Sequence, residues 1–233
     1  AAAGIVIQNS SPTIRNCRFM VYSAAPMWLV NSNSTLSDLY IEGNLGSVQI
    51  TGGAPTLERV TVSTIDTRLS GTNATLTDCS MTDCDTGWIF TGAGLSIRDS
   101  VATLNRCTIA RNVAGYDNEY GAHGGGVYVD NSTVRFRACI IARNRAQAHF
   151  DIDGEGGGAY LLNSETRFDN CRFERNFSES LGGAVYVRGG EATFNNCTVV
   201  ANTAILAGGA VYASGTTATV NNSIVWANGT YEA

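Results

Sequence analysis

The chain has 233 residues, of which 15 are basic, 20 are acidic and 26 are glycine, and its formal net charge is -5. Every basic residue is arginine, and the acidic balance argues against sequence-independent binding to nucleic acid, which needs a basic surface. Frequent glycine with only 3 prolines, and no apolar run long enough to cross a membrane, indicates an all-β chain of short strands and tight turns.

A repeat organises the sequence and predicts its strands in chain order. In its clearest form, the apolar residue of a Gly-Gly-x-apolar-Tyr segment stands 12 residues before a Cys position, which stands 5 residues before an Asn. Val185, Cys197 and Asn202 are one example. The Cys position recurs at separations of 22, 21, 19, 28, 32, 32, 26 and 26 residues, namely at Cys17, Leu39, Val60, Cys79, Cys107, Cys139, Cys171, Cys197 and Ser223.

Each copy carries three short apolar stretches that are divided by turn residues, and no segment has the period of a helix. Three strands in each of nine copies predict a parallel β-helix, in which every strand lies on its equivalent in the next copy. Alternation then turns columns of apolar side chains inward. One column is Ile14, Leu36, Leu57, Leu76, Leu104, Phe136, Phe168, Phe194 and Val220; another is Phe19, Ile41, Val62, Met81, Ile109, Ile141, Phe173, Val199 and Val225.

These features resemble the right-handed parallel β-helix proteins of the pectate-lyase-like superfamily. The segments Gly182–Val185 and Phe173–Asn176 also look like the GGA[ILV] and FxxN repeats of chlamydial polymorphic outer-membrane proteins, which are surface-displayed autotransporter adhesins. The likeness extends over nearly the whole chain and is strongest in the last four or five copies. It implies a right-handed coil and a rung geometry, and it leaves the activity open.

Six of the seven cysteines share the Cys column, where Leu39 and Val60 also occur, so the column needs a small or medium apolar group. Side chains one strand apart lie about 4.8 Å from each other, which is too far for a disulfide, and we expect free thiols. Cys84 is the exception, because it stands where other copies carry Asn; a bridge from Cys79 to Cys84 is the alternative. The Asn column follows the third strand, where Asn tolerates a left-handed backbone and stacked amides can hydrogen-bond: Asn44, Asn112, Asn144, Asn176, Asn202 and Asn228.

The tyrosine of the Gly-Gly segment alternates with inward valines, so it points outward. We therefore predict an external stripe of Tyr128, Tyr160, Tyr186 and Tyr212. Ring stacking that stiffens the sheet is one interpretation, and a contact platform for a glycan or a partner chain is the other.

The two 32-residue separations place insertions in consecutive copies, at residues 113–123 and 145–155, so we expect these loops to be neighbours. Loops on a rigid scaffold commonly carry function. The insertions hold both histidines, five acids and two further ligand-binding candidates: His123, His149, Asp117, Glu119, Asp151, Asp153, Glu155, Tyr116 and Tyr120.

Three interpretations of the insertions stay open. The first is a calcium site, since Asp151-Ile-Asp-Gly-Glu155 resembles half of a calcium loop; its ligands would be Asp151, Asp153, Glu155 and Asp117. The second is an acid–base pair that cuts a glycosidic bond, drawn from His123, His149, Asp151, Asp153, Glu155 and Arg143. The third is a solvated loop pair whose acids are balanced by Arg111, Arg143 and Arg175.

Neither end of the sequence has a polar cap, so we expect residues 1–233 to be a single β-helix domain within a longer rod or an end-to-end assembly. The expected function is an extracellular or cell-surface structural and adhesion module that presents the two loops and the Tyr stripe. The alternative is a carbohydrate-active enzyme, a polysaccharide lyase or glycoside hydrolase, or a non-catalytic glycan-binding module on the same face. Expected partners are other copies, flanking rungs or a glycan; we expect no nucleic acid, no membrane insertion and no required cofactor, with calcium as the open case.

Overall fold

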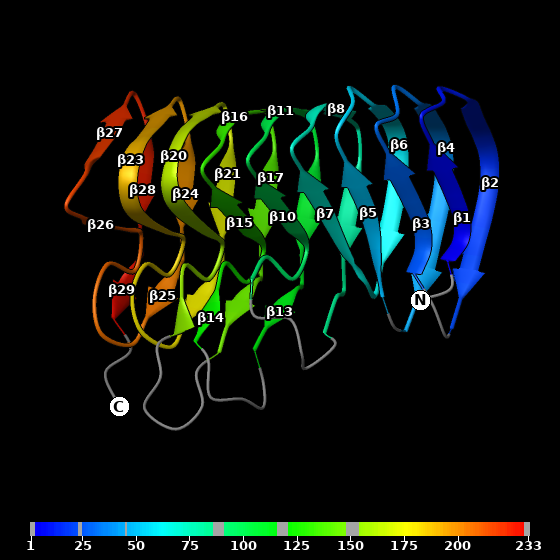
Figure 1. Ribbon diagram of the computed structural model, residues 1–233. Helices are drawn as coiled ribbons and strands as arrows, with labels where there is room; N and C mark the ends of the chain where they lie inside the picture. The colour runs from blue at the N-terminus through cyan, green and yellow to red at the C-terminus, as the bar shows by residue number, and fades with distance from the viewer. Residues whose placement is uncertain are drawn as a thin grey trace.

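The computed structural model describes residues 3–22, 25–44, 46–85, 91–115, 121–147 and 154–230. These residues form strands, and they contain no helix with the length and hydropathy needed to cross a membrane. The chain coils along one axis, and parallel strand pairs join successive coils (Figure 1). The predicted solenoid is confirmed, and each coil is called a rung below.

Each rung contributes one strand segment to each of three parallel ladders. The first ladder consists of β1 (Ala3–Gln8), β3 (Ala25–Val30), β5 (Ser47–Thr51), β7 (Asp66–Ser70), β10 (Leu95–Arg98), β15 (Val127–Asp130), the starts of β20 (Ala159–Asp169) and β23 (Val185–Asn195), and β26 (Val211–Ser214). The second consists of the starts of β2 (Thr13–Val21), β4 (Thr35–Gly43) and β6 (Thr56–Ser63), then β8 (Asn73–Thr77), β11 (Val101–Asn105), β16 (Thr133–Arg137), the ends of β20 and β23, and β27 (Thr217–Asn221). The third consists of the ends of β2, β4 and β6, then β9 (Ser80–Thr82), β12 (Thr108–Ala110), β17 (Ile140–Ala142), β21 (Arg172–Glu174), β24 (Thr198–Val200) and β28 (Ile224–Trp226).

The later rungs carry more than the three predicted strands. A fourth parallel ladder follows the Asn column and consists of β13 (Val113–Ala114), β18 (Arg145–Ala146), β22 (Phe177–Ser178), β25 (Thr203–Ala204) and β29 (Gly229–Thr230). A further pair, β14 (Ala122–His123) and β19 (Gly154–Glu155), joins the two long insertions. These short strands lie together along one side of the coil (Figure 1).

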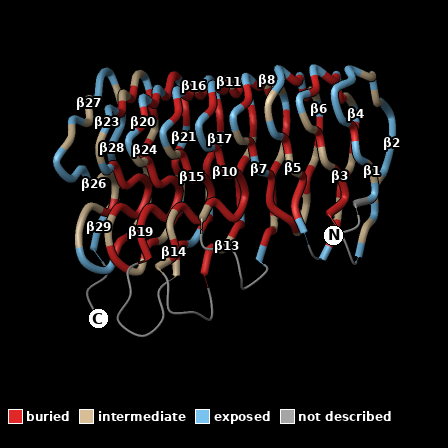
Figure 2. The backbone as a smooth tube through the Cα atoms, in the orientation of Figure 1, coloured by how far each residue is buried: buried red, intermediate tan, exposed pale blue. Residues whose placement is uncertain are grey.

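The core lies inside the coil, as the two inward columns predict (Figure 2). Leu104, Phe136 and Phe168 are paired in register and fully buried. The ring centroids of Phe136 and Phe168 are 4.8 Å apart, which is the spacing of adjacent strands. At the last rung the inward-facing Val220 and Val225 are 46% and 52% exposed, so the core is open there. Continuation or stacking of rungs at this end stays a prediction.

The Asn column forms a continuous ladder of side-chain amides in the last five rungs. Asn144 Nδ2 donates to Asn176 Oδ1 at 3.0 Å, and Asn176 Nδ2 donates to Asn202 Oδ1 at 2.9 Å. Asn112 and Asn228 extend the ladder at its two ends, whereas Asn44 is exposed. Each Oδ1 also accepts the backbone N–H of the preceding rung, so the amides satisfy a buried turn.

The expected left-handed backbone lies one residue before the Asn column. Arg111, Arg143 and Arg175 have φ values of 58°, 57° and 52°, whereas none of the ladder asparagines has a positive φ. The prediction that the ladder Asn itself takes this conformation is therefore wrong. The physical reason is that the backbone changes direction at the arginine. The Asn that follows can then keep an ordinary backbone conformation and direct its side chain into the coil.

All seven cysteines are free, so the alternative of a Cys79–Cys84 bridge is wrong. The thiols of the column are satisfied by carbonyl groups: Cys139 Sγ lies 3.5 Å from Leu104 O on the previous rung. Cys84 lies in a separate small cluster of buried residues with three alanines. Six of the seven thiols are thus buried packing groups, as predicted, whereas Cys17 on the first rung is exposed.

One carboxyl is buried in the fourth rung without full compensation. Asp66 is 1% exposed; its Oδ2 accepts from Arg68 Nε at 2.5 Å, and its Oδ1 has no hydrogen-bond partner. Burial raises the pKa of Asp66 above its usual value, and the Arg68 charge and hydrogen bond offset only part of this. The folded state therefore holds this proton more tightly than the unfolded chain.

An Asp66→Asn variant is expected to be more stable than the wild type at pH 7. The pKa of Asp66 is about 3.9 in the unfolded chain and higher in the folded state. The free energy of unfolding therefore falls as pH rises through these two values. Asn does not ionise, so the variant does not lose this stability. Thermal unfolding at pH 3 and pH 7 checks the difference, which should vanish at pH 3. Asp78→Asn is the opposite control, because a hydrogen bond from Arg106 lowers the pKa of Asp78.

Candidate functional site

The predicted tyrosine stripe exists in register on the first ladder. The ring centroids are 5.6 Å apart from Tyr128 to Tyr160, 5.0 Å from Tyr160 to Tyr186 and 5.4 Å from Tyr186 to Tyr212, with interplanar angles of 6°, 13° and 8°. These are stacked rings, one per rung. The sequence therefore places the stripe correctly on the outer side of the coil wall.

The stripe is covered, so the prediction of an exposed aromatic surface is wrong. Tyr128, Tyr160 and Tyr186 are only 6%, 2% and 5% exposed. The segments that precede the Gly-Gly strands pack on the rings. The ring centroids of His123 and Tyr160 are 4.6 Å apart, and Leu181 packs against the same tyrosines. Burial raises the pKa of Tyr160 to about 12, although a hydrogen bond with Arg188 opposes the rise, so the phenol stays neutral.

The two insertions are neighbours, as predicted, because β14 pairs with β19 and β13 pairs with β18. His123 Nδ1 lies 3.4 Å from Glu155 Oε2, but the two groups are not aligned for a hydrogen bond. Arg143 is exposed at its own turn, and no described interaction joins it to this pair. The other candidates lie outside the described residues: Tyr116, Asp117, Glu119, Tyr120, His149, Asp151 and Asp153.

Two of the three arginines proposed to balance the loop acids form ion pairs with other acids in the described part of the chain. Arg111 binds Asp83 through two hydrogen bonds of 2.6 and 2.7 Å, and Arg175 pairs with Glu174 at 3.0 Å. These two arginines thus pair with acids of the coil wall, and balance of the loop acids by Arg111, Arg143 and Arg175 stays a prediction, because the loop acids other than Glu155 lie outside the described residues. Within the described ranges no group of three or more His, Cys, Asp or Glu side chains could hold a metal ion. Calcium at the 151–155 segment stays a prediction.

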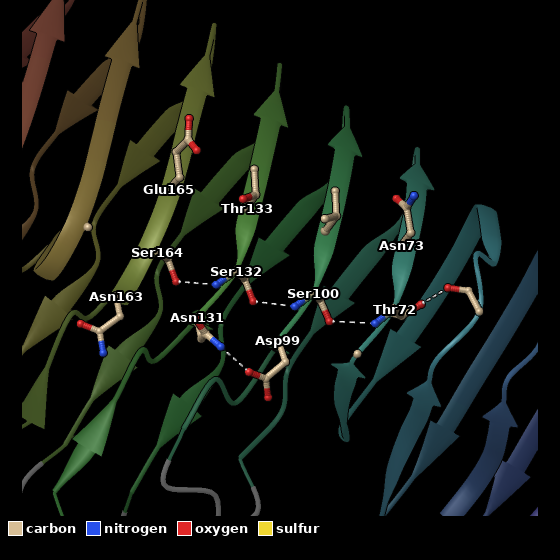
Figure 3. A pocket seen from close by; sticks show the side chains of 14 residues that line it. Thr72, Asn73, Asp99, Ser100, Asn131, Ser132, Thr133, Asn163, Ser164 and Glu165 are labelled. Atoms are coloured by element: carbon tan, nitrogen blue, oxygen red, sulfur yellow. Dashed lines mark hydrogen bonds between the residues drawn. The ribbon is translucent and has the colours of Figure 1, made fainter.

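A shallow groove follows the turn between the first and second ladders. Its volume is about 690 Å³, and it extends across the wall from Gly53 to Gly190. Figure 3 shows its side chains on successive rungs: Thr72, Asn73, Asp99, Ser100, Asn131, Ser132, Thr133, Asn163, Ser164 and Glu165. Val101 also lines the groove. Five rung intervals of about 4.8 Å make the groove ~24 Å long.

A serine ladder forms the floor of the groove. Ser132 Oγ accepts from the backbone N–H of Ser100 at 3.0 Å, and Ser164 Oγ accepts from that of Ser132 at 3.1 Å (Figure 3). Each hydroxyl also donates to the carbonyl two residues before it, as Ser132 does to Asp130 at 2.7 Å. The serine hydroxyls are therefore occupied within the wall.

The residues beside the serines present free surface to the groove. The second ladder exposes Asn73, Thr133 and Glu165. On adjacent rungs beside them, Asn131 Nδ2 donates to Asp99 Oδ1 at 2.6 Å. The groove was missed by sequence reasoning. A signal was available, because Asp99-Ser100, Asn131-Ser132 and Asn163-Ser164 recur at one fixed offset from the Cys column.

The coil, its parallel ladders and its side-chain columns agree with a comparison against known families. The family described as "Right handed beta helix region" matches residues 1–123 and 116–232. This chain belongs to that family. The parallel β-helix predicted from the repeat, and the right hand that the resemblance to pectate-lyase-like proteins implies, are thereby confirmed.

Comparisons with individual proteins add little to the β-helix assignment. Among solved structures, the crystal structure of pectate lyase Pel9A is similar with a TM-score of 0.34 and 11% sequence identity, covering 97% of this chain and 70% of that one. A comparison with curated proteins gives no match. The function must therefore be argued from the surface of this β-helix itself.

Proposed function

We propose that this β-helix is a rigid, non-catalytic module that binds an extended, uncharged polysaccharide along the groove between its first and second ladders. The observation that carries the proposal is the groove itself, an open channel of about 690 Å³ that crosses successive rungs and is lined mostly by Gly, Ser, Thr, Asn, Asp and Glu. An elongated site of this kind suits a polymer better than a small molecule, which prefers an enclosed, apolar pocket.

The chemistry of the groove supports a neutral ligand. Its exposed polar groups are the hydroxyl of Thr133, the amides of Asn73, Asn131 and Asn163, and the carboxylates of Asp99 and Glu165. Val101 adds an exposed apolar side chain, and no arginine lines the groove. Hydroxyl, amide and carboxylate groups bind sugar hydroxyls by hydrogen bonds. Two uncompensated carboxylates disfavour an acidic polymer, because like charges repel.

Rigidity supports binding without catalysis. The serine ladder precedes the second strand of each rung, and the asparagine ladder follows the third strand. Because both ladders hold the wall in place, the protein loses little conformational entropy when a polymer binds. His123, Glu155 and Arg143 are the described members of the predicted catalytic set, and none of them lines the groove. The repeats that look like chlamydial surface-protein repeats favour a location outside the cell, which we include in the proposal.

A Thr133→Arg variant is expected to abolish this binding. The long side chain would lie across the groove, beside Glu165 of the next rung. Affinity electrophoresis in gels that contain dextran, galactomannan or xyloglucan measures the effect as loss of retardation. Thr217→Arg is the matched control, because Thr217 occupies the same column beside Glu191 but lies outside the groove. Absence of retardation with all three polymers, or retardation of Thr133→Arg equal to the wild type, would refute the proposal.

A further inference from the structure

A second hollow lies on the same strands as the groove, about 13 Å further along them, since four residues of about 3.3 Å separate Thr133 from Arg137. Its volume is about 570 Å³. It is formed by β16, β20, β23, the turns that follow them and the turn after β27. Its lining is Arg135, Arg137, Ala138, Arg167, Asp169, Asn170, Asn195, Asn196 and Asn222. Unlike the groove, it is rich in cationic and amide donors.

The one carboxylate in this hollow is already saturated. Asp169 Oδ2 accepts from Arg135 at 2.7 Å, and Oδ1 accepts from Arg167 at 2.9 Å and from Asn195 at 3.0 Å. Burial alone would raise the pKa of Asp169, but the hydrogen bonds from Arg167, Asn195 and Arg135 lower it below its usual value. The carboxyl is thus ionised at neutral pH, and three arginines against one carboxylate leave a local formal charge of +2.

Arg137 pairs in register with Asp169 on the next strand, but that carboxylate is held by Arg135 and Arg167. Arg137 is exposed, and within the described ranges no hydrogen bond or ion pair engages its guanidinium. Earlier rungs differ: Arg59 holds Asp38 and Arg106 holds Asp78, each through paired hydrogen bonds between adjacent turns. The position equivalent to Arg59 and Arg106 is occupied here by Ala138.

Ala138 therefore opens the hollow in two ways. It has no side chain to fill the space, and it supplies no partner for a carboxylate on the neighbouring turn. The same turn column continues as Asn170, Asn196 and Asn222, which are exposed and have left-handed backbones with φ values of 55°, 52° and 48°. One free guanidinium thus lies beside a row of primary amides at rung spacing.

We propose that this hollow binds a tetrahedral oxyanion, as a sulfate or phosphate group. Guanidinium groups bind such anions through paired, charge-assisted hydrogen bonds. A tetrahedral anion has enough oxygens to accept from Arg137, from the remaining N–H groups of Arg135 and Arg167, and from an amide. Asp169 already accepts from Arg135 and Arg167, so an added anion must accept from donors spread around the hollow, and a tetrahedral group directs its oxygens to more of them than a planar carboxylate does.

The test is isothermal titration of the whole chain at low ionic strength with sodium sulfate, sodium phosphate, dextran sulfate and unsulfated dextran. We expect Arg137→Gln to weaken binding of the sulfated probe about tenfold, since a charge-assisted contact is lost. Arg15→Gln is the matched control: Arg15 occupies the same outward column on the first rung, is also exposed, and lies outside the hollow. Tighter binding of dextran sulfate than of inorganic sulfate identifies a polymer-borne ester, and equal binding per group identifies the free ion.

Asp169→Asn provides a second, independent test. It removes the competing carboxylate and keeps the shape, so binding of sulfate should become about fivefold tighter at low salt. No heat with any anionic probe, or equal affinities of wild type, Arg137→Gln and Asp169→Asn, would overturn the inference. This outcome is separate from the polysaccharide proposal, because Arg137 and Asp169 do not line the groove and the neutral polymers carry no charge.

Discussion

Gly157→Ala is expected to destabilise the rod by more than about 4 kcal/mol, because overpacking against backbone cannot be relieved by a rotamer change. A Cβ at Gly157 would overlap the carbonyl group of Phe177 and lie 2.7 Å from the carbonyl oxygen of Gly183. Both neighbours are held by their own hydrogen bonds between rungs, so the wall would have to separate. Urea unfolding followed by circular dichroism, together with the soluble yield, measures the loss.

Gly215→Ala is the control for this prediction. Gly215 has a φ of 62°, and a Cβ there meets nothing within 4 Å. Its cost is therefore limited to the left-handed backbone, about 1 kcal/mol. Similar stabilities for the two variants would contradict the claim that close approach of rungs, and not backbone conformation, requires the second Gly of the Gly-Gly pair.

The periodic part of the fold could be predicted from the sequence because each rung repeats the same local choices. Leu104 and Phe136 stand at one offset from the Cys column, and equal offsets become neighbours as soon as the strands pair in register. The same reasoning placed Cys139 among free thiols and Asn144 in an amide ladder. These predictions needed only the strand spacing and the alternation of side chains.

The part that could not be predicted depends on segments without a period. Alternation correctly turned Tyr160 outward, but its burial results from the insertion that carries His123 across it. The hollow beside Arg137 depends on a missing side chain at Ala138, which a search for chemically active residues does not detect. Surface sites on this rod therefore arise where the repeat is interrupted, whereas its core arises where the repeat is kept.

Asn176→Leu is expected to lower the free energy of unfolding by about 4 kcal/mol, because it removes four buried hydrogen bonds and leaves polar partners unsatisfied. Asn176 Nδ2 donates to Ile141 O and Asn202 Oδ1, both at 2.9 Å. Its Oδ1 accepts from the backbone N–H and from Nδ2 of Asn144, both at 3.0 Å. Leu has a similar volume and satisfies none of these groups.

Two variants separate the role of the amide from that of shape. Asn228→Leu removes the terminal member of the ladder, next to the exposed Trp226, where water can replace lost bonds; we expect at most half the effect. Asn176→Asp keeps the shape and the acceptor but loses both donors and brings a carboxylate against Asn202 Oδ1, so it should destabilise more at pH 7 than at pH 3. Unfolding of the three variants in urea at both pH values measures these differences, and equal losses for Asn176→Leu and Asn228→Leu would show that the ladder does not act through buried hydrogen bonds.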